Sequence, residues 1–155
     1  QNPPSSSSSS SSTTSIISRF QEYLRINTAH PNPNYYEAAD FILSQGKALS
    51  LESQTLEFVK NKPVILLKWR GKDPNLPSVL LNSHTDVVPV EVDKWVYPPF
   101  AAHIDSHGNI YARGSQVSTS IKLGSFSLSL SLCACVLLSF VEVGDRHKIA
   151  AFYGR

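Results

Sequence analysis

Residues 76–89 read LPSVLLNSHTDVVP and constrain the fold more than any other stretch of the chain. Three apolar residues that favour strands, Val79, Leu80 and Leu81, follow two prolines and lead directly into a polar cluster. This pattern predicts a buried strand with reactive side chains at its carboxyl end. Ligands of open α/β sheets bind outside the carboxyl ends of the strands, so His84 and Asp86 are well placed to act together.

His84 and Asp86 form a His-x-Asp triplet that suits metal binding. Imidazole is the commonest nitrogen ligand of zinc, and such a His usually donates its other ring N–H to a carboxylate that fixes its tautomer. We therefore expect His84 to be a metal ligand and Asp86 to orient it. The spacing also fits a second interpretation, in which His84 caps a turn at the strand end and Asp86 begins the next loop.

Two helices are predicted upstream of this strand. In the first, over residues 15–26, apolar residues recur at steps of three and four: Ile16, Phe20, Tyr23 and Leu24. The second begins near Asn34, where Asn34 and Glu37 have capping-box spacing, and Gly46 offers a stop. A rigid, proline-rich turn that contains His30 connects the two helices.

The period then changes from helical to extended. Residues 51–60 alternate between polar and apolar side chains, and residues 63–69 are strongly apolar, so the two segments are predicted to pair as a hairpin. With the strand that ends at His84, the order helix, helix, strand, strand, strand describes the first half of an α/β domain.

A second hairpin is predicted over residues 101–113, with its turn at residues 105–109. His103 alternates on one of its strands and His107 lies in its turn, so exposed or half-buried structural roles are favoured over metal ligation. The tryptophans, Trp69 and Trp95, are expected in the core or at its rim.

Three strings, SHTDVVP, KWVYPPF and HIDSHGNIYARGSQ, occur in this order along the chain. Together they resemble the first metal-ligand region of the aminoacylase-1-like zinc metallopeptidases, and in detail the plant-type N-acyl-L-amino-acid amidohydrolases. The resemblance covers residues 15–116, which correspond to the first quarter or so of such an enzyme. It implies an α/β fold, as the incomplete N-terminal part of a zinc-peptidase catalytic domain, and places the tryptophan loop on the rim of the active-site cleft.

The resemblance also implies a function. In this family zinc-bound water hydrolyses a small N-acyl-L-amino acid to a carboxylate and a free amino acid, with His84 carried over as a zinc ligand and Asp86 as the catalytic-site residue that orients it. The family has two zinc ions, a cytoplasmic location and a homodimer whose dimer-forming domain lies outside the resemblance. A related dipeptidase or carboxypeptidase shares SHTDVVP, and a non-enzymatic truncated isoform is a further alternative. If the N-terminus follows a removed signal peptide, the location is the secretory pathway instead.

The resemblance stops at Gln116. In the family an Asp that bridges the two zinc ions follows at once, and the Glu that acts as general base comes later, but here the next residue is Val117. Only His84 and Asp86 carry over, whereas a catalytic zinc takes about three protein ligands. We therefore expect the chain to be inactive alone.

Residues 117–155 are expected to form a non-family tail. Serines alternate with Phe and Leu between residues 125 and 131, which predicts a strand more readily than a membrane span, although residues 123–141 carry no charge. Gln116, Val117 and Ser118 spell the in-frame translation of a common splice-donor sequence. The tail is therefore hypothesised to be translated intron.

Composition bounds the remaining possibilities. Residues 1–14 are dominated by serine, which has little apolar surface to offset the entropy of ordering, so this segment is predicted to be disordered. The 14 basic and 12 acidic residues give a net charge of +2 and no basic patch, which argues against nucleic-acid or membrane-surface partners. The cysteines, Cys133 and Cys135, are too close for a disulfide framework.

Overall fold

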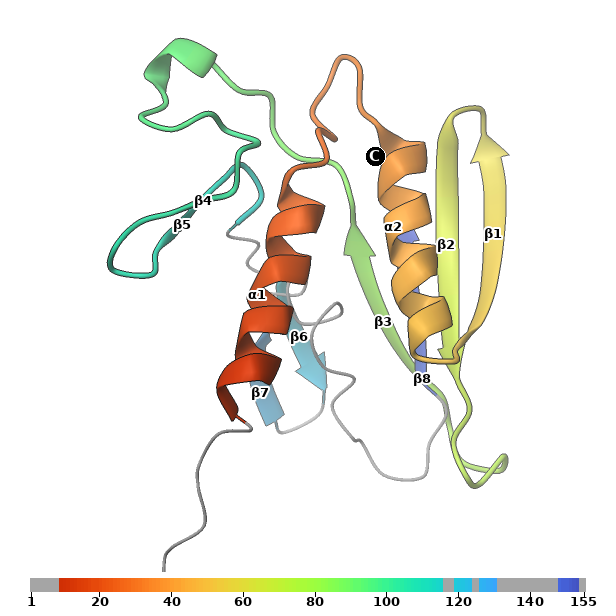
Figure 1. The fold of residues 1–155 in the computed structure, drawn as a ribbon. Helices are drawn as coiled ribbons and strands as arrows, with labels where there is room; N and C mark the ends of the chain where they lie inside the picture. The colour runs from red at the N-terminus through yellow and green to blue at the C-terminus, as the bar shows by residue number, and fades with distance from the viewer. Residues whose placement is uncertain (1–8, 116–118, 124–125, 131–147, 154–155) are drawn as a thin grey trace, which may run out of the picture.

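The computed structural model describes residues 9–115, 119–123, 126–130 and 148–153 (Figure 1). Its helices and strands, in chain order, are α1 Ser9–Leu24, α2 Tyr35–Ala48, β1 Glu52–Val59, β2 Lys62–Trp69, β3 Val79–His84, the short 3-10 helix η1 Val92–Lys94, β4 His103–Ile104, β5 Ile110–Tyr111, β6 Thr119–Leu123, β7 Phe126–Leu130 and β8 Lys148–Tyr153. This mixture confirms the predicted α/β class.

The main sheet has four strands in the order β1-β2-β8-β3. β1 and β2 form the predicted antiparallel hairpin, with Asn61 in the left-handed conformation at its turn (φ 64°). β8 pairs antiparallel with β2 and parallel with β3. This segment belongs to the predicted non-family tail, and no prediction of a strand was made for it. Its sequence, KIAAFY, carries strand-forming Ile, Phe and Tyr, but the run is short and follows a charged cluster.

α2 covers one face of the sheet beside β2 (Figure 1). Ile65 and Leu67 of β2 are buried against α2 and the end of α1. The other buried residues of this cluster are Tyr23, Ile26, Ala38, Ala39 and Ile42. Burial of these side chains, at about 25 cal/mol per Å² of apolar surface, supplies the main driving force for folding. The alternation of buried and half-buried residues along β2 is the pattern expected of a strand with one covered face.

The sequence suggested that α2 ends at Gly46. This prediction is wrong, because the helix continues to Ala48. The role of Gly46 is a close approach to β2, since a Cβ atom built at Gly46 would lie 2.7 Å from Cδ2 of Leu67. The capping box predicted at Asn34 and Glu37 is also wrong in detail. The Asn34 side chain makes no capping bond to the backbone and instead donates to Glu37 Oε2 at 3.1 Å.

α1 begins at Ser9, within the serine-rich segment that was predicted to be disordered, and so starts earlier than expected. The packed end of the helix explains its stability. Phe20 and Leu24 are buried with Ala102 and Ala112 beside the β4-β5 hairpin, while Tyr23 contributes to the cluster under α2. α1 therefore connects the two clusters, and its upstream turns extend a helix that tertiary packing has already nucleated.

β3 lies at an edge of the main sheet, and the prediction of a buried strand is wrong at Leu80, which is 59% exposed. Ser83, near the end of the strand, is buried. Side chains alternate along a strand, so Leu80 and Ser83 point to opposite faces of β3, of which the first is open to solvent and the second is covered.

The second predicted hairpin is confirmed as β4-β5. Asp105 accepts the backbone N–H groups of His107 and Asn109 at 2.9 and 2.8 Å, and Gly108 adopts φ +84°. The Asn109 side chain also donates a hydrogen bond to this carboxylate. That bond lowers the pKa of Asp105 the most, and the backbone bonds lower it further. The turn is therefore organised by one carboxylate.

The strand expected in the serine-alternating tail is present as β7, which pairs with β6 in a separate two-stranded sheet. Gln116, Val117 and both cysteines lie outside the described residues. No helix among the described residues is long and apolar enough to cross a membrane. Most of the charge-free span at residues 123–141 lies outside them.

We predict that Gly46→Ala lowers the free energy of unfolding by about 1 kcal/mol, because overpacking against Leu67 outweighs the better helix propensity of alanine. Urea denaturation of the variant measures this. Adding Leu67→Val should recover part of the loss, since the shorter side chain makes room for the new methyl group. A Gly46→Ala variant more stable than the parent would contradict the contact.

We also predict that Ala150→Pro destabilises the main sheet by about 2 kcal/mol or more, because proline removes a ladder donor from a strand flanked on both sides. Ala150 pairs with both Leu67 and Leu81, so hydrogen exchange of those two amides should accelerate. The matched control is Ser129→Pro in β7, which should leave these amides protected. Equal effects of the two prolines would disprove a central role for β8.

Candidate metal centre

His84 is the last residue of β3, and its ring turns toward Asp86 two residues later. Nδ1 of His84 lies 3.1 Å from Oδ1 of Asp86 and 3.0 Å from the Asp86 backbone carbonyl oxygen. Both neighbours are acceptors, so Nδ1 carries the ring proton and donates it. The lone pair of Nε2 is then available for a metal ion, which is the arrangement that metal-binding histidines adopt.

The parallel pairing of β3 with β8 places their carboxyl ends at the same edge, since His84 is in register with Tyr153. In open α/β sheets this edge is where ligands bind. The side chains of His84 and Asp86 are 29% and 16% exposed, so the pair is accessible but largely enclosed.

The loop after β3 is fastened to the connection between α1 and α2. The hydroxyl group of Thr28 donates to the Thr85 carbonyl oxygen at 2.6 Å, and the N–H of Val87 donates to the Thr28 carbonyl oxygen at 3.3 Å. An isolated bridge between Ala29 and Val87 continues this contact. Thr28 and Thr85 are both buried, so water does not compete for these bonds.

Tyr35, the first residue of α2, is a neighbour of the pair that sequence analysis did not identify. Its hydroxyl group lies 3.2 Å from Nε2 of His30, and the two rings meet edge to face. Burial raises the pKa of Tyr35, and the negative charge of Asp86 raises it further. The proline-rich turn at residues 29–33 was visible in the sequence, but nothing there indicated that it begins with a bridge from Ala29 to Val87, in the loop after β3.

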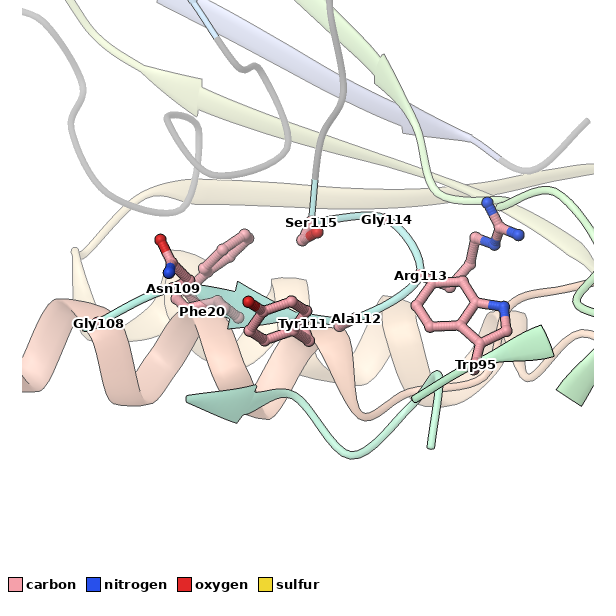
Figure 2. Close-up of a pocket in the computed structure, with 10 residues that line it drawn as sticks. Phe20, Trp95, Gly108, Asn109, Tyr111, Ala112, Arg113, Gly114 and Ser115 are labelled. Atoms are coloured by element: carbon pink, nitrogen blue, oxygen red, sulfur yellow. The ribbon is translucent and has the colours of Figure 1, made fainter. Parts of the chain in front are cut away.

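A larger, open cavity of about 940 Å³ lies beside the β4-β5 hairpin (Figure 2). Its lining residues are Phe20 of α1, Trp95 of the tryptophan loop and residues 108–115. The guanidinium group of Arg113 lies over the Trp95 ring, 4.9 Å from the ring centroid. Arg113 also lines a second, much smaller cavity together with His84 and Asp86.

The described residues fit part of a zinc site. None of them forms a group of three or more His, Cys, Asp or Glu side chains that could hold a metal ion. A catalytic zinc takes three protein ligands, of which His84, oriented by Asp86, would supply one. His103 is stacked on Tyr97 at 3.9 Å and His107 is exposed in the hairpin turn, so both occupy structural positions.

The sequence of this chain is similar to those of several known proteins. Residues 80–133 match peptidase family M20/M25/M40, so the match runs past Gln116. Mouse aminoacylase-1 is 47% identical over 107 residues, covering 69% of this chain and 26% of that protein. Rat aminoacylase-1B is 45% identical over 133 residues, covering 86% and 29%. The chain thus spans about a quarter of the length of the curated relatives it matches.

Two carboxypeptidases are also similar. Yeast carboxypeptidase S is 30% identical over 132 residues, covering 72% of this chain and 22% of that protein. Among solved structures, the M20 family metallo-carboxypeptidase Sso-CP2 from Sulfolobus solfataricus superposes with a TM-score of 0.64 at 20% identity, covering 88% of this chain and 30% of that one. At 20% identity, the likeness to Sso-CP2 concerns the fold alone.

We predict that Thr28→Val lowers the free energy of unfolding by about 1–2 kcal/mol, because the shape is kept while the buried Thr85 carbonyl oxygen loses its donor. Amide resonances of residues 84–87 should shift in NMR spectra. Thr55→Val on the exposed strand β1 is the matched control and should change neither quantity. Unchanged spectra in Thr28→Val would show that the loop is held by other contacts.

Proposed function

Since the chain belongs to peptidase family M20/M25/M40 as an aminoacylase-1-like segment, we propose that the β3 edge contributes a zinc ligand to a site that hydrolyses N-acyl-L-amino acids. The observation that carries this proposal is the contact between Nδ1 of His84 and Oδ1 of Asp86 at 3.1 Å. It leaves Nε2 of His84 as the ligand atom. The 47% identity to mouse aminoacylase-1 supports the amidohydrolase class.

Each residue of the site has a separate task. Asp86 accepts a hydrogen bond from Nδ1–H of His84, which fixes the tautomer and the orientation of the ring. Thr28 holds the loop between them through the Thr85 carbonyl oxygen. Zinc, when bound, polarises an amide carbonyl oxygen and makes water a stronger nucleophile. The family resemblance extends the proposal to two zinc ions, a small N-acyl amino acid and a cytoplasmic homodimer.

The chain alone is proposed to be inactive. The described residues supply one ligand position, while a catalytic zinc takes three protein ligands and a general base beside them. The Asp86 carboxylate is turned to the imidazole of His84 and serves as its orienting partner.

A related metallo-carboxypeptidase is the second candidate, favoured by the sequence likeness to yeast carboxypeptidase S. Substrates of both classes have a free carboxylate and differ in what precedes the scissile amide. Zinc-dependent binding of N-acetyl-L-leucine against glycyl-L-leucine therefore separates them. Tighter binding of the acylated amino acid is expected for an aminoacylase.

We predict that the purified chain keeps no stoichiometric zinc after desalting and hydrolyses no N-acetyl-L-methionine, because one protein ligand cannot retain the ion. A zinc titration followed by NMR should nevertheless shift the ring resonances of His84. His84→Ala should abolish this response, and Asp86→Ala should weaken it about 10- to 100-fold. Metal analysis and the titration check these outcomes.

His107→Ala is the control, because it removes an exposed histidine from a turn distant in sequence and should leave the zinc response unchanged. One tightly held zinc with measurable turnover would contradict the proposal of an inactive chain. A zinc response that survives His84→Ala would place the ligand elsewhere.

A further inference from the structure

The cavity beside the β4-β5 hairpin is lined by three aromatic rings and by polar groups, of which one is charged. Phe20, Trp95 and Tyr111 supply the rings, and Figure 2 shows Trp95 and Arg113 together at one end. The described residues that line the cavity include no carboxylate, so none of them neutralises the charge of Arg113. Such a cavity suits a small molecule with an apolar part and an anionic group.

Arg113 is held firmly by its backbone. Its N–H donates to the Pro99 carbonyl oxygen at 2.7 Å. The next residue, Gly114, adopts φ +86°, and a Cβ atom built there would lie 3.0 Å from Cγ1 of Val87. The turn that carries Arg113 therefore packs directly on the loop that follows His84. Arg113 and the candidate metal edge thus lie on segments that contact each other.

The guanidinium group of Arg113 is oriented but not satisfied. The face of Trp95 lies 4.9 Å from it, which fixes its plane through a cation–π contact. Its Nε atom is buried and has no hydrogen-bond partner among the described residues. A buried, charged N–H without an acceptor is unfavourable, and the planar donor pair of arginine matches the two oxygens of a carboxylate.

We propose that Arg113, held by Trp95, binds the carboxylate of the N-acyl amino acid. This inference rests on the proposed function and names the group that selects its substrate class. Arg113 lines both the large cavity and the small one that contains His84 and Asp86. A molecule anchored by its carboxylate at Arg113 therefore lies beside the metal edge, with its apolar parts against the aromatic rings.

The test uses the full chain in a Trp69→Phe background, where Trp95 is the sole tryptophan and reports on the cavity by its fluorescence. EDTA is present throughout. N-acetyl-L-leucine should change the fluorescence saturably, and its neutral analogue N-acetyl-L-leucine amide should bind about tenfold more weakly or worse, because the charge-assisted bonds are lost. Arg113→Gln should weaken binding of the acid by a similar factor and leave that of the amide unchanged.

Two further variants make the outcome decisive. Arg113→Lys keeps the charge but loses the planar donor pair, so an intermediate weakening is expected. Arg70→Gln removes an exposed arginine that is paired with Glu52, and should bind the acid like the parent. If far-UV circular dichroism shows that Arg113→Gln does not fold, the proposal is tested by Arg113→Lys and by comparing the affinities of the parent for the acid and the amide.

Equal affinities for acid and amide, an Arg113 variant that binds the acid like the parent, or no saturable response would each overturn the proposal. Since EDTA excludes zinc from this experiment, these results are independent of the zinc titration at His84. A failure of the carboxylate site is thus distinguished from a failure of the proposed metal ligand.

Discussion

The parallel pairing of β3 with β8 is the interaction on which the rest of the described structure depends. β2 and β3 are not neighbours in the sheet, so β8 joins the hairpin and its helical cover to the strand that ends at His84. The register places His84 opposite Tyr153, which aligns the carboxyl ends of the two strands. Without this pairing, the candidate metal ligand would sit on a strand that no described neighbour holds in place.

A second set of contacts secures the loop beyond β3. In the connection between the helices, Thr28 bonds to Thr85 and Ala29 forms a bridge with Val87. Tyr35 lies close enough to Asp86 for its negative charge to raise the pKa of the tyrosine. Because α1 packs on both clusters, this connection is fixed at its two ends. The orientation of His84 is therefore set by the first half of the chain as well as by its own strand.

The same loop couples the metal edge to the cavity. Val87 meets the turn at Gly114, and Arg113 beside it faces Trp95. An imidazole that favours a cation and a guanidinium that favours an anion thus lie on adjoining segments. With a metal ion held at the imidazole, this arrangement would suit a molecule that presents a carbonyl oxygen to the ion and a carboxylate to the guanidinium group.

The sequence by itself determined the local structure. Alternation and helical spacing predicted the first hairpin and both helices, the Asp and Asn residues of the turn predicted the second hairpin, and the short spacing of His84 and Asp86 at a strand end made their contact foreseeable. These features depend on neighbours within a few residues, which periodicity records.

Only the tertiary structure decided the long-range arrangement. The insertion of β8 between β2 and β3, the packing of Gly46 on Leu67, and the seat of Arg113 on Trp95 each join segments far apart along the chain. From the sequence alone, a glycine in a helical pattern predicts the end of the helix, and a short apolar run after charged residues is assigned to a tail. Only the contacts with Leu67 and with β2 and β3 reveal their actual roles. The physical reason is that such contacts are selected by the shape and bonding of the opposing surface, which local sequence does not encode.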